Sequence, residues 1–275
     1  MLRDYPPFDI YASRFDNTEN VIMNGLQNII YNPNDEMGPS DNENFLFAWH
    51  HIAENFSRRS LTNQTDKLPA LAGIATTIGR ISGMTYMGGI WKEKLLQGLR
   101  WEVDRKHSAS AEEIKRYGRP TWFAPTWSWA SVSEPISWLY DDKYKSVIDI
   151  IDIKGCDSVL SSRGSITLSG KGERKKIHHT LRDEERYRGS YPFRIHEIHS
   201  FIADEYMKDS SDVLLFYISM DTETHLFSTK REKEYLTALV LSGSNGRYRR
   251  VGVVERVDMY ESEFNLLKTM EITII

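Results

Sequence analysis

The 275-residue sequence contains one cysteine, Cys156, and no long hydrophobic run. A single cysteine excludes an internal disulfide and a cysteine-based zinc site, and it fits a reducing compartment, so we expect a cytoplasmic protein. No stretch approaches the roughly 18 apolar residues that a membrane-spanning helix needs. The first residues also lack the apolar segment of a signal peptide. We therefore expect no membrane partner.

An excess of basic charge is also missing. The chain has 35 Lys and Arg against 39 Asp and Glu, a formal net charge of −4, which argues against a nucleic-acid partner bound through bulk charge. The phosphate-binding GxxxxGK[ST] pattern, the Rossmann glycine spacing and the GxSxG turn do not occur. His196 and His199 stand one residue short of the HExxH spacing, without a clear third ligand. We expect no cofactor and no metal.

Tryptophan is absent after residue 138, and this divides the chain. The seven tryptophans are Trp49, Trp91, Trp101, Trp122, Trp127, Trp129 and Trp138. We predict a helical, tryptophan-rich part over residues 1–140 and a β-rich part over 141–275, packed as one compact unit.

Apolar spacing predicts three helices in the first part: one over 43–57, one that begins at Asp66 as its N-cap, and one over 89–101. Their predicted buried faces are, in chain order, Phe45, Trp49, Ile52 and Phe56; then Leu71, Ile74, Ile78 and Ile81; then Trp91, Leu95 and Leu99.

Short β-branched runs dominate the second part, at 147–153, 165–169, 213–218, 236–241, 251–254 and 272–275. The charge-dense stretch between Gly170 and Gly189 is typical of a solvated loop, with a phosphate or partner contact as the alternative. We predict an α+β fold in which the helical part packs on a mostly antiparallel sheet, barrel or sandwich.

The segment APTWSWASV at 124–132 is the most unusual in the chain. Trp127 and Trp129 alternate with Ser128 and are expected on one face of an extended strand. Two interpretations stay open. The indole rings build a rigid core where the helices meet the sheet, or they line an apolar cavity for a hydrophobic ligand.

A candidate site follows from the second interpretation. His50 and His51 flank Trp49, and His50 stands four residues before Glu54, a spacing that can tune an imidazole for proton transfer. They are the candidate catalytic residues, although a structural pair on an amphipathic helix is the alternative. The candidate substrate-binding residues are Trp49, Arg58, Tyr86, Trp91, Trp127 and Trp129.

Several longer blocks resemble fungal heterokaryon-incompatibility (HET) family proteins in order and spacing. They lie at 57–62, 66–75, 86–91, 95–101, 124–132, 248–252 and 272–275. In that family these blocks follow the HET domain, which we expect to be absent here, so the resemblance implies a fungal source and a free-standing copy of the accessory region. It implies no cell-death activity and names no catalytic residue.

Two functions remain open. The first is a cofactor-independent enzyme of fungal secondary metabolism, an isomerase or cyclase that folds a hydrophobic small molecule, for example in a Diels–Alder-like cyclisation. The second is a protein-interaction or sensing module, which needs an exposed apolar patch. A cavity walled by the tryptophans would favour the enzyme, and solid packing the module. The oligomeric state stays open.

Overall fold

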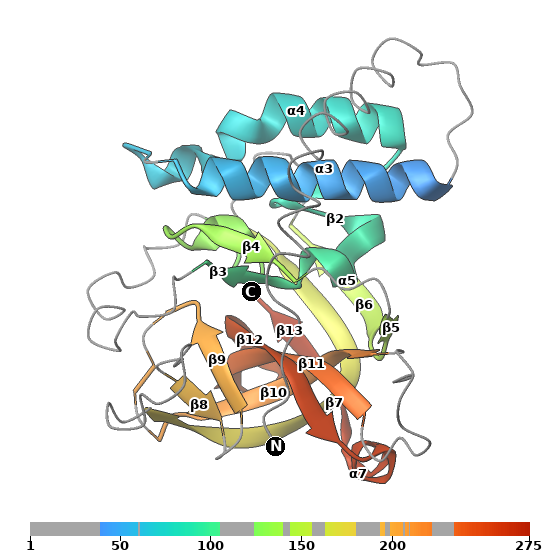
Figure 1. Cartoon of the computed structure of the whole chain (residues 1–275), viewed down its shortest axis with the longest axis vertical. Coiled ribbons are helices and arrows are strands. Elements are labelled where there is room, and N and C mark those ends of the chain that lie inside the picture. The colour runs from blue at the N-terminus through green and yellow to red at the C-terminus, as the bar shows by residue number, and fades with distance from the viewer. Residues whose placement is uncertain are drawn as a thin grey trace, which may run out of the picture.

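A helical layer lies at one end of the molecule and a large sheet at the other, with short strands between them (Figure 1). The computed structural model describes residues 39–59, 61–104, 124–139, 144–155, 163–179, 193–195, 199–205, 207–208, 210–221 and 234–275. This arrangement confirms the predicted α+β fold, with helices in the first part and a mostly antiparallel sheet in the second. The predicted boundary at residue 140 falls outside the described residues.

Helices α3 (Pro39–Ser57) and α4 (Lys67–Ser82) form the helical layer. Phe45 and Trp49 are buried on α3 as predicted. Asp66, at the end of the short 3-10 helix η1 (Gln64–Asp66), is the N-cap residue of α4. The prediction for Ile74 was wrong, because it is 43% exposed. The α4 helix instead turns another stripe to the core, made of Leu68, Leu71, Ala75 and Ile78.

The predicted third helix was wrong, because two glycines place a hairpin where it would begin. Gly88 and Gly89 have φ values of 50° and 102°, which fit a tight turn between two strands and not a right-handed helix. The segment contains β1 (Tyr86–Met87), β2 (Ile90–Trp91), the 3-10 helix η2 (Lys92–Lys94), the four-residue α5 (Leu95–Gly98) and β3 (Trp101–Val103). β3 pairs with β4 (Ile136–Trp138).

Nine strands form one sheet within the described part of the chain, and all six predicted runs belong to it. The strands are β5 (Tyr144–Ser146), β6 (Asp149–Lys154), β7 (Ser165–His179), β8 (Phe193–Ile195), β9 (His199–Ala203), β10 (Asp212–Asp221), β11 (Glu234–Ser244), β12 (Arg247–Met259) and β13 (Thr269–Ile274).

The charged stretch after Gly170 is a strand as far as residue 179, so the predicted loop was wrong there. Gly172 and Ile177 are buried between the charged residues, and the partner strand β10 supplies the backbone hydrogen bonds. The other half of the predicted loop, 180–189, lies outside the described residues.

The strand pairings close into a circuit that makes the sheet a barrel. Antiparallel pairs run from β7 to β10, β11, β12, β9, β8 and back to β7. β13, which follows the short helix α7 (Glu261–Leu266), pairs with both β7 and β12, and its pairing with β12 is parallel.

Both faces of the central strands are buried, and they contribute to two separate cores. On β10, Leu214, Phe216 and Ile218 pack with the aromatic residues of the first part. The intervening residues of β10 join a second core that also contains Phe264 of α7. One sheet face therefore holds the helical layer in place.

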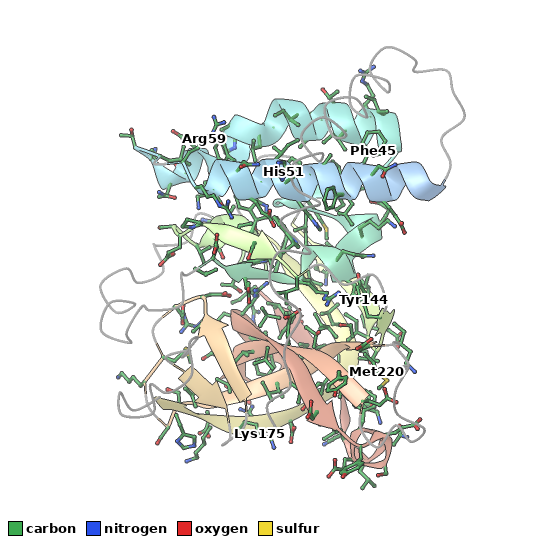
Figure 2. The ribbon with its side chains drawn as sticks, in the orientation of Figure 1. Phe45, His51, Arg59, Tyr144, Lys175 and Met220 are labelled. Atoms are coloured by element: carbon green, nitrogen blue, oxygen red, sulfur yellow. The ribbon has the colours of Figure 1, made fainter. Side chains whose placement is uncertain are left out.

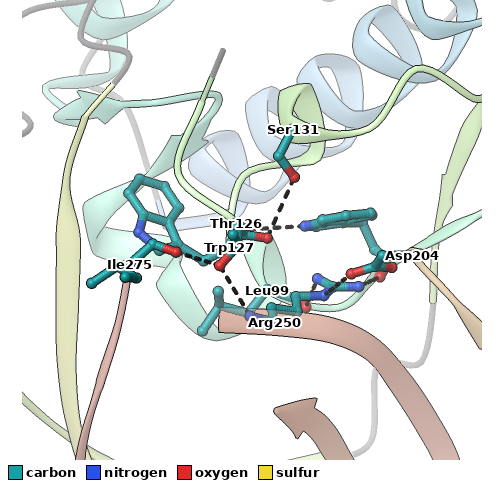
Figure 3. Close-up of polar contacts among 8 residues, drawn as sticks. Leu99, Thr126, Trp127, Ser131, Asp204, Arg250 and Ile275 are labelled. Carbon is teal, nitrogen blue, oxygen red and sulfur yellow. Dashed lines mark hydrogen bonds and ion pairs between the residues drawn. The ribbon is translucent and has the colours of Figure 1, made fainter. Parts of the chain in front are cut away.

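A fully buried arginine on β12 fastens the two parts together (Figure 3). Arg250 Nη1 donates to the carbonyl of Leu99 at 2.9 Å, and Nη2 donates to the carbonyl of Trp101. The guanidinium carbon lies 3.6 Å from the centre of the Trp101 ring. Arg250 Nε also lies 3.1 Å from Oδ2 of Asp204, which is likewise fully buried.

Thr126 makes a second link beside this arginine (Figure 3). Its hydroxyl accepts from the backbone N–H of Arg250 at 3.0 Å and donates to the carbonyl of Ile275. Its own backbone N–H donates to the same carbonyl at 3.0 Å. The tryptophan segment is thus bonded to β12 and to the residue after β13.

We predict that Arg250→Met lowers the free energy of unfolding by about 3–5 kcal/mol, because it removes one partner of a fully buried ion pair. Arg58→Met is the control. Arg58 and its partner Asp104 are 52% and 38% exposed, so loss of this ion pair should cost about 1 kcal/mol or less. Urea unfolding measures both variants, and equal losses would contradict the assigned role of Arg250.

Candidate functional site

The backbone carbonyl of Gly89 is the centre of the aromatic cluster. Trp49 Nε1 from α3 donates to it at 2.9 Å, and Trp129 Nε1 donates to it at 2.8 Å. Trp129 begins the 3-10 helix η3 (Trp129–Ser131). One carbonyl therefore holds two indoles that come from distant parts of the sequence.

The turn at Gly88 and Gly89 packs tightly against two indole rings. A Cβ atom added to Gly88 would lie 2.8 Å from the Trp127 ring, and one added to Gly89 would lie 2.7 Å from Trp129 Nε1. Both glycines also have positive φ. Only glycine fits at these positions, because space and backbone conformation both exclude a side chain.

Trp49, Tyr86 and Trp91 contact one another edge to face. The ring centres of Tyr86 lie 5.2 Å from those of both tryptophans, and the two tryptophan rings lie 5.6 Å apart. Tyr86 and Trp91 are directly paired across the β1–β2 hairpin. Burial raises the pKa of the Tyr86 phenol. These contacts are typical of a rigid aromatic core.

All five aromatic residues predicted to bind substrate therefore lie in one buried cluster. The expected extended strand at Trp127 and Trp129 was wrong, because Trp127 lies in a turn and Ser128 caps η3 through its hydroxyl, which accepts from Ala130 N at 3.1 Å. The described contacts around Gly88 and Gly89 show rings packed against backbone. They support the rigid-core interpretation at this turn.

His50 stacks on a tryptophan at the edge of this cluster. Its ring lies 4.1 Å from that of Trp138, with the two planes inclined by 6°. Burial lowers the pKa of His50 to about 3, so the ring is neutral near pH 7 and is a weak base. The proton-transfer role assigned to His50 stays a prediction that this environment does not favour.

Two side chains of α3 satisfy the backbone of β4. A carboxylate oxygen of Glu54 accepts from the backbone N–H of Trp138 at 2.7 Å. The hydroxyl of Ser57 accepts from the backbone N–H of Ile136 at 3.0 Å. The helix thus takes the place of a strand along one edge of β4.

His51 and Arg58 do not take part in the hydrogen bonds at the Gly89 carbonyl. His51 is half-buried on α3, between Phe45 of the same helix and Arg59, which lies just past its end (Figure 2). Its Nε2 atom has no hydrogen-bond partner in the structure as described. Arg58 is exposed and forms an ion pair with Asp104 at 2.8 Å, which links the end of α3 to the end of β3.

Sequence reasoning missed the buried charges that hold this region together. Lys67 Nζ donates to the carbonyl of Val132 and lies 6.0 Å from the Trp129 ring, and burial lowers its pKa to about 8. Arg250 and Asp204 were not singled out either. The sequence offers no signal for them, because Arg250 follows Arg249 and Asp204 precedes Glu205, as charged surface residues often do, and the partners are far apart in sequence.

Comparison with family models, curated proteins and solved structures finds no match for this chain. The resemblance to HET family proteins stays a prediction. No helix in the described ranges is long and apolar enough to cross a membrane. Among the described residues, no group of three or more His, Cys, Asp or Glu could hold a metal ion. The side chains of His196 and His199 lie outside them, as does Cys156.

We predict that Gly89→Ala lowers the free energy of unfolding by about 2–5 kcal/mol, through its positive φ and the clash with Trp129. Gly73→Ala is the control. Gly73 lies inside α4 with no atom near an added Cβ, so alanine should raise stability by about 1 kcal/mol. Denaturant unfolding distinguishes the two. A Gly89→Ala protein as stable as the parent would contradict the tight packing.

His50 should also make stability fall in acid. Its folded pKa of about 3 lies below the unfolded value of 6.5, so unfolding takes up a proton between these two pH values. The free energy of unfolding should fall by up to about 1.4 kcal/mol per pH unit as the pH drops through this range.

The pH dependence of stability that His50 contributes should be absent from His50→Phe. The variant His178→Phe, at an exposed position on β7, should retain it. Urea unfolding at pH 4, 5, 6 and 7 gives the slopes. Identical slopes in the parent and His50→Phe would show that His50 is not held neutral.

Proposed function

We propose that this chain is a protein-interaction or sensing module related to the accessory region of fungal HET proteins. The observation that carries the proposal is the packing of the aromatic cluster. Its rings contact one another and the Gly88–Gly89 turn, so they act as a rigid support for the outer surface that would contact a partner. The sequence blocks that resemble HET family proteins suggest the family, and those blocks contain Gly88, Gly89, Trp127 and Trp129.

A cofactor-independent cyclase has less support. Such an enzyme needs a dry, shaped cavity and a group that polarises the substrate. The aromatic residues assigned to the cavity wall contact each other. His50 is stacked on Trp138 and is neutral. We therefore favour the interaction module over a catalyst for a hydrophobic small molecule.

The exposed apolar residues of β6 are the contact surface that we assign to the module. Ile150 and Ile151 are adjacent and are 48% and 52% exposed, and the pairing with β7 shifts register between Ile150 and Asp152. Ile153 on the same strand packs against the first core and anchors it. Asp149 precedes the pair, which favours a partner segment with apolar side chains next to a Lys or Arg, whereas Asp152 is already paired with Lys154 at 2.8 Å.

The double variant Ile150→Asp with Ile151→Asp tests this assignment. Both side chains are exposed, so the fold should survive, while the apolar contact is lost and like charge is added. Leu266→Asp is the control, because Leu266 on α7 is 86% exposed and lies outside the assigned surface. A protein captured from the source organism by the parent is purified and titrated against all three by calorimetry.

We expect the double variant to bind the purified protein at least tenfold more weakly, and Leu266→Asp to bind like the parent. Equal binding by the double variant would refute the β6 surface. Saturable one-to-one binding of an apolar dye to the parent, lost in Trp127→Ala variants that remain folded, would instead favour the small-molecule hypothesis.

A further inference from the structure

One edge of β6 has no partner strand within the described part of the chain. β6 pairs with β7 alone and lies at the side of the sheet, below α5 (Figure 1). No hydrogen bond joins the backbone of 149–153 to a described element other than β7. A free edge presents a row of N–H and C=O groups with which another extended chain can pair. The β6 contact surface assigned above therefore lies beside an open edge.

The apolar side chains of β6 share one face of the sheet. Ile150 lies opposite Leu168, and Ile153 lies opposite Ile166. Both partners on β7 belong to the first core, so the two isoleucines point to that face. Ile151 is the extra residue where the pairing with β7 shifts register. It is 52% exposed.

The charged side chains of β6 lie on the other face. Asp149, Asp152 and Lys154 stand opposite residues of β7 that carry hydroxyl groups. Asp152 is paired with Lys154 at 2.8 Å, whereas Asp149 forms no ion pair with any described residue. The Lys154 side chain is 77% exposed, and its ammonium group has three N–H donors. It can therefore bind a second carboxylate while it keeps Asp152.

A second copy of β6, paired antiparallel, matches both faces in one register. In this register Asp149 lies opposite Lys154 of the second copy, and Ile150 lies opposite Ile153. The two-fold axis passes between Ile151 and the next residue, so each of these pairs occurs twice. The two register shifts then face each other. Apolar side chains meet on one face and opposite charges meet on the other.

Other antiparallel registers lose this match. A shift by one residue places Ile150 opposite a charged residue of the second copy, which lies on the other face. A shift by two residues in one direction brings Asp149 opposite Asp152, which puts like charges together. The same shift in the other direction brings Asp152 opposite Ile153. The strand is therefore complementary to itself in a single register.

We propose that two copies of this chain pair through the free edge of β6 in this register and form one continuous sheet across a two-fold axis. The match of charge and of face favours a second copy over an unrelated segment. The inference rests on the proposed function, because it names a partner at the β6 contact surface. The second copy lies beside Ile150 and Ile151, so it competes with any other protein that binds there.

Sedimentation velocity across a wide range of protein concentration tests the pairing in the full chain. The parent should dimerise. Asp149→Lys and Lys154→Glu each turn two attractive pairs into two repulsive ones and should weaken the dimer about fivefold or more. The combined variant restores opposite charges and should recover most of the affinity. Lys145→Glu makes the same charge reversal at an exposed position of β5, outside the register, and should dimerise like the parent.

A parent that stays monomeric would refute the self-pairing. A combined variant no better than the two single ones would refute the pairing of Asp149 with Lys154. All the exchanged side chains are exposed, so these variants should fold.

Disulfide crosslinking tests the register without reversing a charge. In a Cys156→Ser background, Ile150→Cys with Ile153→Cys places thiols opposite each other across the interface. Within one copy these positions are about 10 Å apart along the strand, too far for a disulfide. Oxidation should therefore give a covalent dimer, whereas the control Ile150→Cys with Lys154→Cys should not. Equal crosslinking of the two double variants would overturn the register.

The self-pairing and the proposed contact with another protein fail separately. If the parent dimerises while Ile150→Asp with Ile151→Asp binds the purified partner protein like the parent, only the contact with that protein is refuted. If the parent is monomeric while the same double variant loses that protein, only the self-pairing is refuted.

Discussion

A guanidinium group without any exposed surface has to be surrounded by acceptors, and at Arg250 this requirement joins the two parts of the molecule. Two of its acceptors are carbonyls at Leu99 and Trp101, and its counter-charge is Asp204 after β9. Since desolvating a lone charge costs far more than a paired one, each partner fixes the others. The position of the tryptophan-rich part on the barrel depends on this arrangement.

The aromatic cluster connects Arg250 to the helical layer. Trp101 stacks on Arg250 and donates to the carbonyl of Trp127, whose ring rests on Gly88. Gly89 then holds Trp49 and Trp129 through one carbonyl. The tryptophans that the sequence predicts as a possible binding site therefore link β12 to α3 through a continuous series of contacts.

Local patterns predicted the elements whose burial is simple. The helical spacing of Phe45 and Trp49 identified α3, and β-branched runs identified the sheet. The spacing of Trp91, Leu95 and Leu99 failed, because it coincided with a helical period while Gly88 and Gly89 imposed a turn. The structure brings the predicted aromatic residues together. Whether their rings fill a core or line a cavity depends on neighbours that are far away in sequence. Arg250 and Asp204 could not be paired for the same reason.

The hydrogen bonds at Arg250 and Thr126 span 151 and 149 positions of the chain. Contacts between such distant residues form late, because a long loop has to close, at a cost in entropy, before the contacts can stabilise the fold. During synthesis the helical layer therefore leaves the ribosome long before β12 exists to receive it. The nascent tryptophan-rich segment therefore has to remain unaggregated through this interval.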